Sequence, residues 1–377
     1  MDAIKISMTP EYFGRLWEYV NDKNITDIDF NGKMLWLRNA DNYRYPVSDH
    51  GIPERFVEQF TQRVADTASK GFNRIEDILE AETDTLRISI IHNETAVTGT
   101  SISIRKSLPE VRITAEDAVK TGYADKQVLS LIANCVKAKM NIAFGGEVGV
   151  GKTEAAKFFT QVIPANERVI TIEDRLEWHY SEINPGKDCV ALKARSLEDY
   201  PRLIKEALTH NANWIMLSEA RSVEVKYLIQ AWSTGIRGVT TLHIDDVRNI
   251  PDRVVNMSGD ALHEKRIEND VYTYLDAGIY LRQAVSGDED KNGHRWIDQI
   301  GFFTRENGVN RCTLTYDDKK RTEAAIPDQA MRKFKRAGIE NPFYCPEIEN
   351  LLSVQETAAE NSVLHGESGV CAVGKGE

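Results

Sequence analysis

The chain has 377 residues, of which 41% are hydrophobic and 28% are charged, and its formal net charge is -11. This length accommodates two or more domains, and the composition is that of an ordinary globular protein. The acidic balance argues against a protein that binds nucleic acid or an anionic membrane over its whole surface, although it leaves a local basic patch open. We therefore expect no direct sequence-specific contact with nucleic acid.

The N-terminal sequence and the cysteines indicate where the protein resides. The start, MDAIKISMTPEYF, lacks the basic residues and the apolar run of a signal peptide, and no apolar run in the chain is long enough to span a membrane. The five cysteines lie far apart without a C-x-x-C pair, which disfavours a zinc knuckle, a thioredoxin-like site and a disulfide framework. We expect a cytoplasmic protein with reduced, structural cysteines.

The first hundred or so residues predict a small α+β domain. Residues 26–30 alternate polar with apolar side chains, and Asn31 and Gly32 provide a tight turn before the apolar residues 34–37, a pattern typical of a β-hairpin. Apolar residues at helical spacing over residues 53–70 predict a helix.

Two further alternating segments, residues 86–90 and 101–105, predict a second pair of strands. Apolar side chains share one face of each segment, whereas Arg87 and Arg105 lie on the polar faces. Together with the hairpin and the helix, these strands predict an N-terminal α+β domain over residues 1–108.

After a linker at residues 109–113, the pattern becomes that of an α/β domain over residues 114–352. Asp125 caps a predicted helix, and short β-rich runs then alternate with helical segments, as in a mostly parallel sheet. The expected strands are residues 141–144, 169–172, 214–217 and 239–242. A further strand at 311–316, a helix at 328–337 and a disordered tail at 353–377 complete the prediction.

A phosphate-binding loop follows the predicted strand at residues 141–144. The sequence GEVGVGKT matches G-x-x-x-x-G-K-[ST], and a helical segment follows from Glu154. The glycines let backbone N–H groups close around phosphate oxygens, Lys152 would neutralise the β- and γ-phosphates, and the Thr153 hydroxyl would bind Mg²⁺. We therefore predict ATP and Mg²⁺ as cofactors. The predicted nucleotide-binding residues are Gly146, Glu147, Val148, Gly149, Val150, Gly151, Lys152, Thr153 and Glu154.

Acidic residues at strand ends supply the candidates for the catalytic base. Glu219 follows an apolar strand, which would bring its carboxylate to the carboxyl edge of the sheet beside the loop, and we take it as the base. Glu173 and Glu177 are alternatives for orienting the attacking water, and Asp174 is a candidate for holding Mg²⁺ through water. Exposed acids without a catalytic role are the other interpretation. His243 ends a further strand and is either a sensor of the γ-phosphate or a structural histidine.

The order of these motifs resembles the traffic-ATPase family of type II and type IV secretion, type IV pili and conjugation. Four segments occur in the family's order and approximate spacing: the phosphate-binding loop, the acidic box TIEDRLE, LSEAR in place of the second nucleotide motif, and GIRGVTTLHIDD in place of the histidine box. The similarity extends to LRISI and SISIRK before the loop and to DAGIYLRQ and RWIDQIGFF after it, over residues 25–305.

This resemblance implies a hexameric ring whose subunits bind nucleotide between an N-terminal domain and a RecA-like ATPase domain, with rotation of one domain against the other as the power stroke. It implies that Arg87 and Arg105 reach the phosphates, the alternative being solvated strand arginines, and that Arg221 and Glu224 make contacts between subunits or domains. The implied partners are inner-membrane secretion, conjugation or pilus proteins, through which the protein would associate peripherally with the cytoplasmic membrane.

Several positions depart from the family pattern. Residues 210–213 read HNAN where an arginine and a Pro-Asp pair are usual, and Ser218 replaces a usual glycine. Ile236 stands where a first histidine is common, and Glu154 where a second threonine is frequent. The loop lysine and threonine, the candidate base and one histidine are retained, so we expect activity. The missing tetracysteine zinc module and the short N-terminal domain favour a conjugation or type IV secretion member, or a pilus relative, over a type II secretion one.

Three classes of function compete on this sequence. The first is an energy-transducing secretion or conjugation ATPase, which we favour. The second is a nucleotide-binding scaffold or regulator that has lost hydrolysis, and the retained Glu219 argues against it. The third is a nucleic-acid translocase or an unrelated P-loop enzyme, and the net acidity of the chain argues against a translocase.

Overall fold

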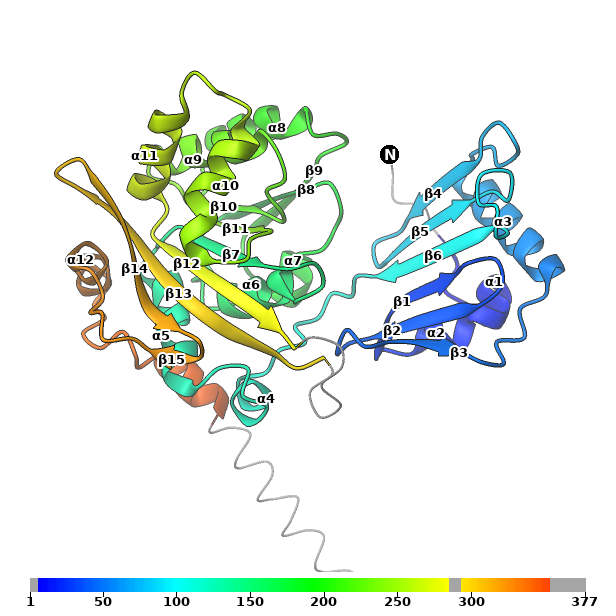
Figure 1. The fold of residues 1–377 in the computed structure, drawn as a ribbon, viewed down its shortest axis with the longest axis horizontal. Helices are drawn as coiled ribbons and strands as arrows, with labels where there is room; N and C mark the ends of the chain where they lie inside the picture. Colours follow the sequence, from blue (N-terminus) through cyan, green and yellow to red (C-terminus); the bar gives the residue numbers. More distant parts are fainter. Residues whose placement is uncertain (1–5, 285–292, 353–377) are drawn as a thin grey trace, which may run out of the picture. The chain divides into compact units, whose positions relative to one another are not determined.

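The computed structural model describes residues 6–284 and 293–352, which form two compact units (Figure 1). The chain divides between Glu110 and Val111. The predicted disordered tail, residues 353–377, lies outside the described residues. The first unit holds the chain up to Glu110, the segment Arg175–His179 and the described residues of Ala284–His294. The second unit holds Val111–Asp174, Tyr180–Gln283 and the described residues from Arg295 onward.

The first unit is built on a 6-stranded antiparallel sheet. The predicted hairpin, the second pair of strands and the predicted helix are all present in it. In sheet order its strands are β3 Arg44–Val47, β2 Leu35–Asn39, β1 Ile25–Phe30, β6 Ser101–Lys106, β5 Leu86–Ile91 and β4 Ile78–Glu82. Its helices are α1 Pro10–Phe13, η1 Gly14–Leu16, α2 Trp17–Asn21 and α3 Glu54–Ala68.

Side-chain alternation divides the two faces of this sheet. Ile88 of β5 and Ile104 of β6 are fully buried in a core shared with α3, so the side chains of Arg87 and Arg105 leave the sheet on its other face. This is the arrangement that the sequence predicts. The segment Arg175–His179 joins the unit through Ser107, whose hydroxyl donates to the carbonyl oxygen of Leu176 at 2.9 Å.

The second unit is built on a 9-stranded sheet. Neighbouring strands from β12 to β9 run parallel, whereas β13, β14 and β15 extend the sheet with antiparallel pairs. All four predicted parallel strands and the predicted strand near residue 311 are present, and the mostly parallel α/β class is confirmed. In sheet order the strands are β15 Lys320–Arg321, β14 Val309–Asp317, β13 Arg295–Glu306, β12 Ala277–Gln283, β7 Ile142–Gly146, β11 Arg237–Leu242, β10 Trp214–Leu217, β8 Val169–Glu173 and β9 Cys189–Lys193.

Helices cover both faces of the parallel part of this sheet. Ala143 of β7 belongs to a core cluster with residues of α8 to α11, whereas the ring of its neighbour Phe144 stacks on Phe159 of α6. Successive side chains of a buried strand therefore meet different helical layers. The helices are α4 Ala115–Lys120, α5 Lys126–Lys137, α6 Lys152–Thr160, α7 Tyr180–Ile183, α8 Asp199–Thr209, α9 Glu224–Ser233, η2 Val247–Asn249, α10 Ile250–Ser258, α11 Glu264–Tyr274 and α12 Asp328–Arg336.

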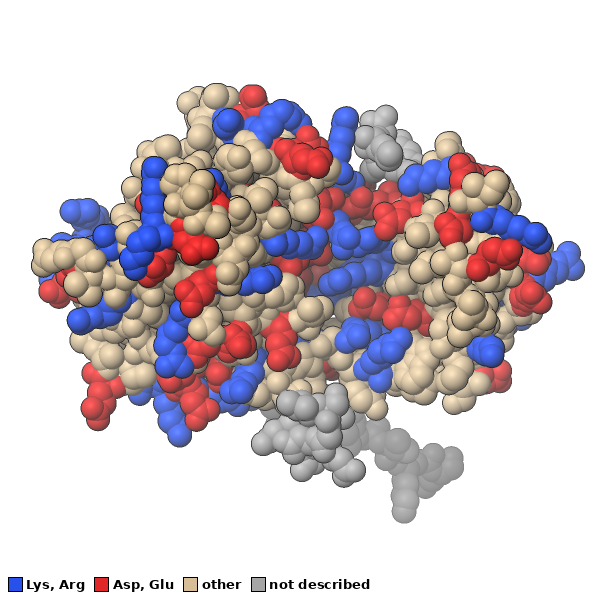
Figure 2. Space-filling view, turned by 45° about the horizontal axis from the view of Figure 1, so that its top comes forward, with Lys and Arg blue, Asp and Glu red and all other residues tan. Residues whose placement is uncertain are grey.

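Membrane spans, cysteines and surface charge bear on where the protein could act. Within residues 6–284 and 293–352, no helix combines the length and the apolar character needed to cross a membrane. The cysteines of these residues are free thiols, as the sequence predicts. On the face shown in Figure 2, basic and acidic side chains of the second unit are mixed rather than gathered by sign.

Candidate active site

The predicted phosphate-binding loop connects β7 to α6 at the carboxyl edge of the parallel strands. Helix α6 begins at Lys152, two residues before the predicted start, so Lys152 and Thr153 belong to its first turn. Gly146 has φ +150°, and a Cβ atom there would lie 2.7 Å from both the Leu281 carbonyl oxygen and Val150 Cγ1. Gly151 has φ +93° and is the N-cap of the helix. Both positions require glycine, which leaves the loop open to a close ligand.

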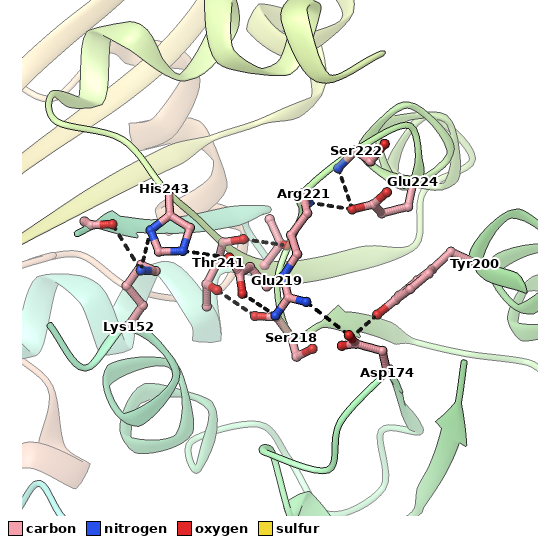
Figure 3. Close-up of polar contacts among 12 residues, drawn as sticks. Lys152, Asp174, Tyr200, Ser218, Glu219, Arg221, Ser222, Glu224, Thr241 and His243 are labelled. Atoms are coloured by element: carbon pink, nitrogen blue, oxygen red, sulfur yellow. Dashed lines mark hydrogen bonds and ion pairs between the residues drawn. The ribbon is translucent and has the colours of Figure 1, made fainter. Parts of the chain in front are cut away.

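The ammonium group of Lys152 lies inside this loop, and the residue is 8% exposed. Its Nζ donates to the carbonyl oxygens of Gly146 at 3.0 Å and Glu147 at 2.8 Å, and lies 3.2 Å from Nδ1 of His243 (Figure 3). These contacts hold the positively charged group at the loop and beside His243.

His243 connects Lys152 to Glu219. Its Nε2 lies 2.7 Å from Glu219 Oε1, and its Nδ1 faces the lysine ammonium (Figure 3). An ammonium group only donates and a carboxylate only accepts, so a neutral His243 carries its proton on Nε2 and accepts at Nδ1. Burial and the charge of Lys152 lower the pKa of His243 below its ordinary value, which favours this neutral form.

Glu219 is held in an ionised state by its surroundings. Burial by itself would raise the pKa of this carboxyl, but the hydrogen bond and charge of Arg221, with the charge of Lys152, outweigh it and lower the pKa. A group that accepts a proton from water must start deprotonated. The site meets this requirement at neutral pH.

The backbone around Glu219 is fixed to the neighbouring strand β11. The hydroxyl of Thr241 donates to the carbonyl oxygen of Ser218 at 2.6 Å, and the N–H of Ala220 donates to the carbonyl oxygen of Thr241 at 2.8 Å. Both residues that flank Glu219 are thus tied to one residue of β11, two positions before His243. This explains how the ends of β10 and β11 bring the candidate base and the histidine together.

Asp174 contacts two side chains that the sequence does not predict as its partners. Its Oδ2 accepts from Nη1 of Arg221 at 3.0 Å, and its Oδ1 accepts from the Tyr200 hydroxyl at 3.4 Å (Figure 3). Arg221 also binds Glu219, through Nη2 and Oε2 at 2.6 Å. The family resemblance implies that Arg221 contacts another subunit or domain, and it does not predict these contacts within one unit. Its position two residues after the candidate base was the available signal.

The two alternative bases lie in different units. Glu173 is the last residue of β8, at the same edge of the sheet as the loop, and it is 1% exposed. Glu177 falls in the segment Arg175–His179, which belongs to the first unit. The contacts described above bring together Lys152, Glu219 and His243, with Arg221 and Asp174 beside them.

Thr153 and Glu154 follow Lys152 in the first turn of α6. The Glu154 carboxylate accepts from Lys157 Nζ at 3.0 Å and from the N–H of Arg112 at 3.4 Å, so its side chain serves contacts within the unit. Across the described parts of the chain, no group of three or more His, Cys, Asp or Glu residues is arranged to hold a metal ion. A P-loop site needs no such cage, because its Mg²⁺ is bound by one hydroxyl, water and the phosphates themselves.

Arg87 and Arg105 face each other across β5 and β6 in the first unit. Arg87 Nη2 lies 3.1 Å from Glu80 Oε1, and Arg105 Nε lies 4.0 Å from Asp27 Oδ1. Like charges directly opposite each other destabilise a sheet, so these two arginines are not explained by the stability of the sheet. Their side chains are 29% and 55% exposed and are accessible to a ligand.

Comparison with known proteins gives the family. A family model described as "Type II/IV secretion system protein" matches residues 73–335. An uncharacterised protein of Bacillus anthracis is 28% identical over 303 residues, which make up 79% of this chain and 68% of that protein. The type IV secretion system protein VirB11 of Bartonella quintana is 33% identical over 134 residues, which make up 34% of this chain and 37% of VirB11. The match to this second relative therefore spans well under half of that protein's length.

Solved structures share the fold at low sequence identity. The ATPase DotB of Legionella pneumophila has a TM-score of 0.53 at 18% identity, covering 82% of this chain and 84% of DotB. The pilus retraction motor PilT with bound ADP has a TM-score of 0.52 at 14% identity, covering 90% of this chain and 88% of PilT. These likenesses concern the fold alone. Since the family model spans more than half of the residues, the chain belongs to the family of type II/IV secretion system proteins.

Proposed function

We propose that this protein hydrolyses ATP with Mg²⁺ and that Glu219 is the catalytic base. The observation that carries the proposal is the contact series from Lys152 through His243 to Glu219 beside a glycine-lined loop. A buried cation, a neutral histidine and an ionised carboxylate at one sheet edge match the needs of phosphoryl transfer, which are charge neutralisation and an oriented water.

Different residues of the second unit would bind the nucleotide and Mg²⁺ and accept the proton of the attacking water. The loop N–H groups and Lys152 would bind the phosphates of ATP, and the lysine would exchange its carbonyl partners for phosphate oxygens. Thr153 would hold Mg²⁺, which would neutralise charge on the β- and γ-phosphates. Glu219 would orient the attacking water and accept its proton. Glu173 and Glu177 are the alternative bases if Glu219 is replaced without loss.

Arg87 and Arg105 are proposed to complete the site from the N-terminal unit. Each would exchange its carboxylate partner for the γ-phosphate, where charge spreads over the equatorial oxygens in the transition state. An arginine delivered by a second unit acts only when the two units close around nucleotide, which ties closure to the nucleotide state. Hydrolysis and domain movement would then be coupled.

At the level of the cell, we propose a homo-hexameric ring that powers secretion of protein or DNA, conjugative transfer or pilus assembly. It would reside in the cytoplasm and associate with the cytoplasmic membrane through partner proteins of the machinery. The family membership supports this role. The similarity to VirB11 and to the conjugal transfer protein TrbB of Rhizobium radiobacter supports the type IV secretion or conjugation branch.

Two other functions remain as outcomes of the test. A nucleotide-binding scaffold would bind ATP and release no phosphate. A nucleic-acid translocase would be stimulated by single-stranded DNA, and the mixed charges on the second unit in Figure 2 speak against a large basic binding area on that face.

The experiment is steady-state phosphate release by the purified chain in Mg²⁺ and in EDTA, each with and without single-stranded DNA. A mass measurement with and without a non-hydrolysable ATP analogue accompanies it. We expect hydrolysis that requires Mg²⁺, no stimulation by DNA, and a hexamer mass with the analogue. Binding without hydrolysis would favour the scaffold, and strong stimulation by DNA would favour the translocase.

A further inference from the structure

Two carboxylates lie at equivalent positions on adjacent parallel strands. Leu217 of β10 pairs with Ile172 of β8 in the parallel register, and Glu219 and Asp174 each follow two residues later. Parallel neighbours lie about 4.8 Å apart, so both negative charges reach the same short stretch of the sheet edge. Two ionised carboxylates this close repel each other unless a cation lies between them.

Arg221 supplies that cation. Its Nη2 binds Glu219 Oε2 at 2.6 Å and its Nη1 binds Asp174 Oδ2 at 3.0 Å, so one guanidinium joins the two acids (Figure 3). The planar guanidinium holds its donors in a rigid fork, and this geometry fixes the separation of the two carboxylates. A lysine has one nitrogen on a flexible stem and cannot fix both at once.

The arginine is itself held at its backbone. Its N–H and that of Ser222 donate to Oε1 of Glu224, a fully buried residue at the start of α9. On the far side of the bridge, the Tyr200 hydroxyl donates to the second oxygen of Asp174. The bridge is therefore anchored at both ends by groups of α8 and α9.

The position of Glu219 follows from these contacts. His243 contacts Oε1 of the Glu219 carboxylate, and Arg221 donates a hydrogen bond to Oε2. The Glu219 side chain is therefore held from two directions (Figure 3). We propose that Arg221 is a positioning residue, which sets the place of Glu219 by binding it and Asp174 together. This inference rests on the proposed role of Glu219 as the base. It differs from the role implied by family resemblance, in which Arg221 contacts another subunit or domain.

The test measures kcat, the Kd for a non-hydrolysable ATP analogue, the assembled mass and the melting temperature of four variants. These are Arg221→Gln, Arg221→Lys, Asp174→Asn and the double variant Arg221→Gln/Asp174→Asn. Arg202→Gln is the matched control, because Arg202 forms an exposed ion pair with Asp199 on α8. Glu219→Gln is measured in the same series to test the proposed function separately.

We expect Arg221→Gln to lower kcat about 10-fold or more with Kd and mass unchanged, because the loss falls on an oriented carboxylate and not on nucleotide binding. Arg221→Lys should recover part of the loss. The double variant should be no slower than Arg221→Gln alone, because residues that act through one bridge give non-additive effects. If Arg221→Gln has a much lower melting temperature than the wild type, kcat and Kd are compared in Arg221→Lys and Asp174→Asn instead.

Three results would overturn the inference. They are wild-type kcat in Arg221→Gln, losses in the double variant that multiply those of the single ones, or a lower assembled mass, which would assign Arg221 to a contact between copies. Full activity in Glu219→Gln would instead reject the base and with it the proposed function. The two failures are therefore distinguishable.

Discussion

The two units carry their cations in opposite ways. Lys152 of the second unit is 8% exposed and donates to backbone carbonyl oxygens, whereas Arg87 and Arg105 of the first unit are partly exposed and lie beside carboxylates. Exposed ion pairs contribute little to stability, so the arginines lose little by changing partners. The buried ammonium group of Lys152 is instead already fixed at the loop by its carbonyl contacts.

This difference suggests that the second unit binds the nucleotide, whereas the two arginines of the first unit couple hydrolysis to domain closure. The lysine and its neighbours form the candidate site within one unit, and the proposed base, Glu219, is already ionised and oriented there. The arginines are in the other unit and would act only on closure. Variants in the second unit should therefore affect the chemistry or the nucleotide directly, and variants of the two arginines should affect the rate without affecting either fold.

The largest expected effect is that of Lys152→Ala. Removing the ammonium group leaves the charge of the β- and γ-phosphates uncompensated, in a site where one such contact is worth about 3 to 4 kcal/mol. We expect ATPase activity to fall by about 100-fold or more in a phosphate-release assay. Lys126→Ala, at a half-exposed lysine of α5, is the control. Wild-type turnover in Lys152→Ala would reject the phosphate-binding loop.

A smaller effect is expected when either arginine of the first unit is replaced. Arg87→Ala and Arg105→Ala should each reduce hydrolysis by about 10-fold or more, because a charge over the γ-phosphate is lost in the transition state. The melting temperature should stay near that of the wild type, because both side chains leave the apolar face and no core cavity opens.

Arg44→Ala is the matched control for these two variants. Arg44 lies in the same sheet and pairs with Asp29 at 3.5 Å. It should keep wild-type activity. Unchanged turnover in both Arg87→Ala and Arg105→Ala would contradict the proposed role, and lost activity together with a collapsed melting temperature would show that the arginines are structural.

The smallest expected effect concerns the pH dependence of stability through His243. Its pKa in the folded protein lies below the ordinary value of 6.5, so the unfolded chain binds a proton that the folded one resists. The stability attributable to this residue is complete above about pH 6.5 and is lost as the pH falls toward the lower, folded pKa. His243→Gln should therefore lose less stability than the wild type between pH 7 and pH 5.

Thermal melting across this pH range measures the difference. His210→Gln, at an exposed histidine after α8, is the control and should follow the wild type. If His243→Gln and the wild type lose stability in parallel, His243 is not held neutral by Lys152 and burial.

Much of the fold was predictable because its signals are local. The alternation around Arg87 and Arg105, the capping by Asp125 and the glycine pattern of the loop depend on neighbours in sequence, and the structure has the corresponding strands, helix and loop. The strands β9, β12 and β13 were not among those predicted from the sequence. Most of β12 and β13 is buried on both faces, so neither strand has the polar–apolar alternation that reveals a half-buried strand.

The candidate site was predictable in its members but not in its contacts. Strand ends at one sheet edge indicate that Glu219 and His243 approach the loop, and the structure places them there. The bridge from Glu219 through Arg221 to Asp174 was missed, because it depends on the register between β10 and β8 and on the direction of one long side chain. The acidic segment TIEDRLE also gives no sign that Glu177 belongs to the first unit while Glu173 belongs to the second.

The most direct test of the account compares nucleotide binding with hydrolysis in Glu219→Gln. The amide keeps the shape of the side chain but cannot accept the proton of the attacking water. We predict that the Kd for an ATP analogue stays within about two-fold of the wild type while phosphate release slows by about 100-fold or more, with Glu206→Gln on the exposed face of α8 as the unaffected control. Phosphate release at the wild-type rate in Glu219→Gln would contradict the account.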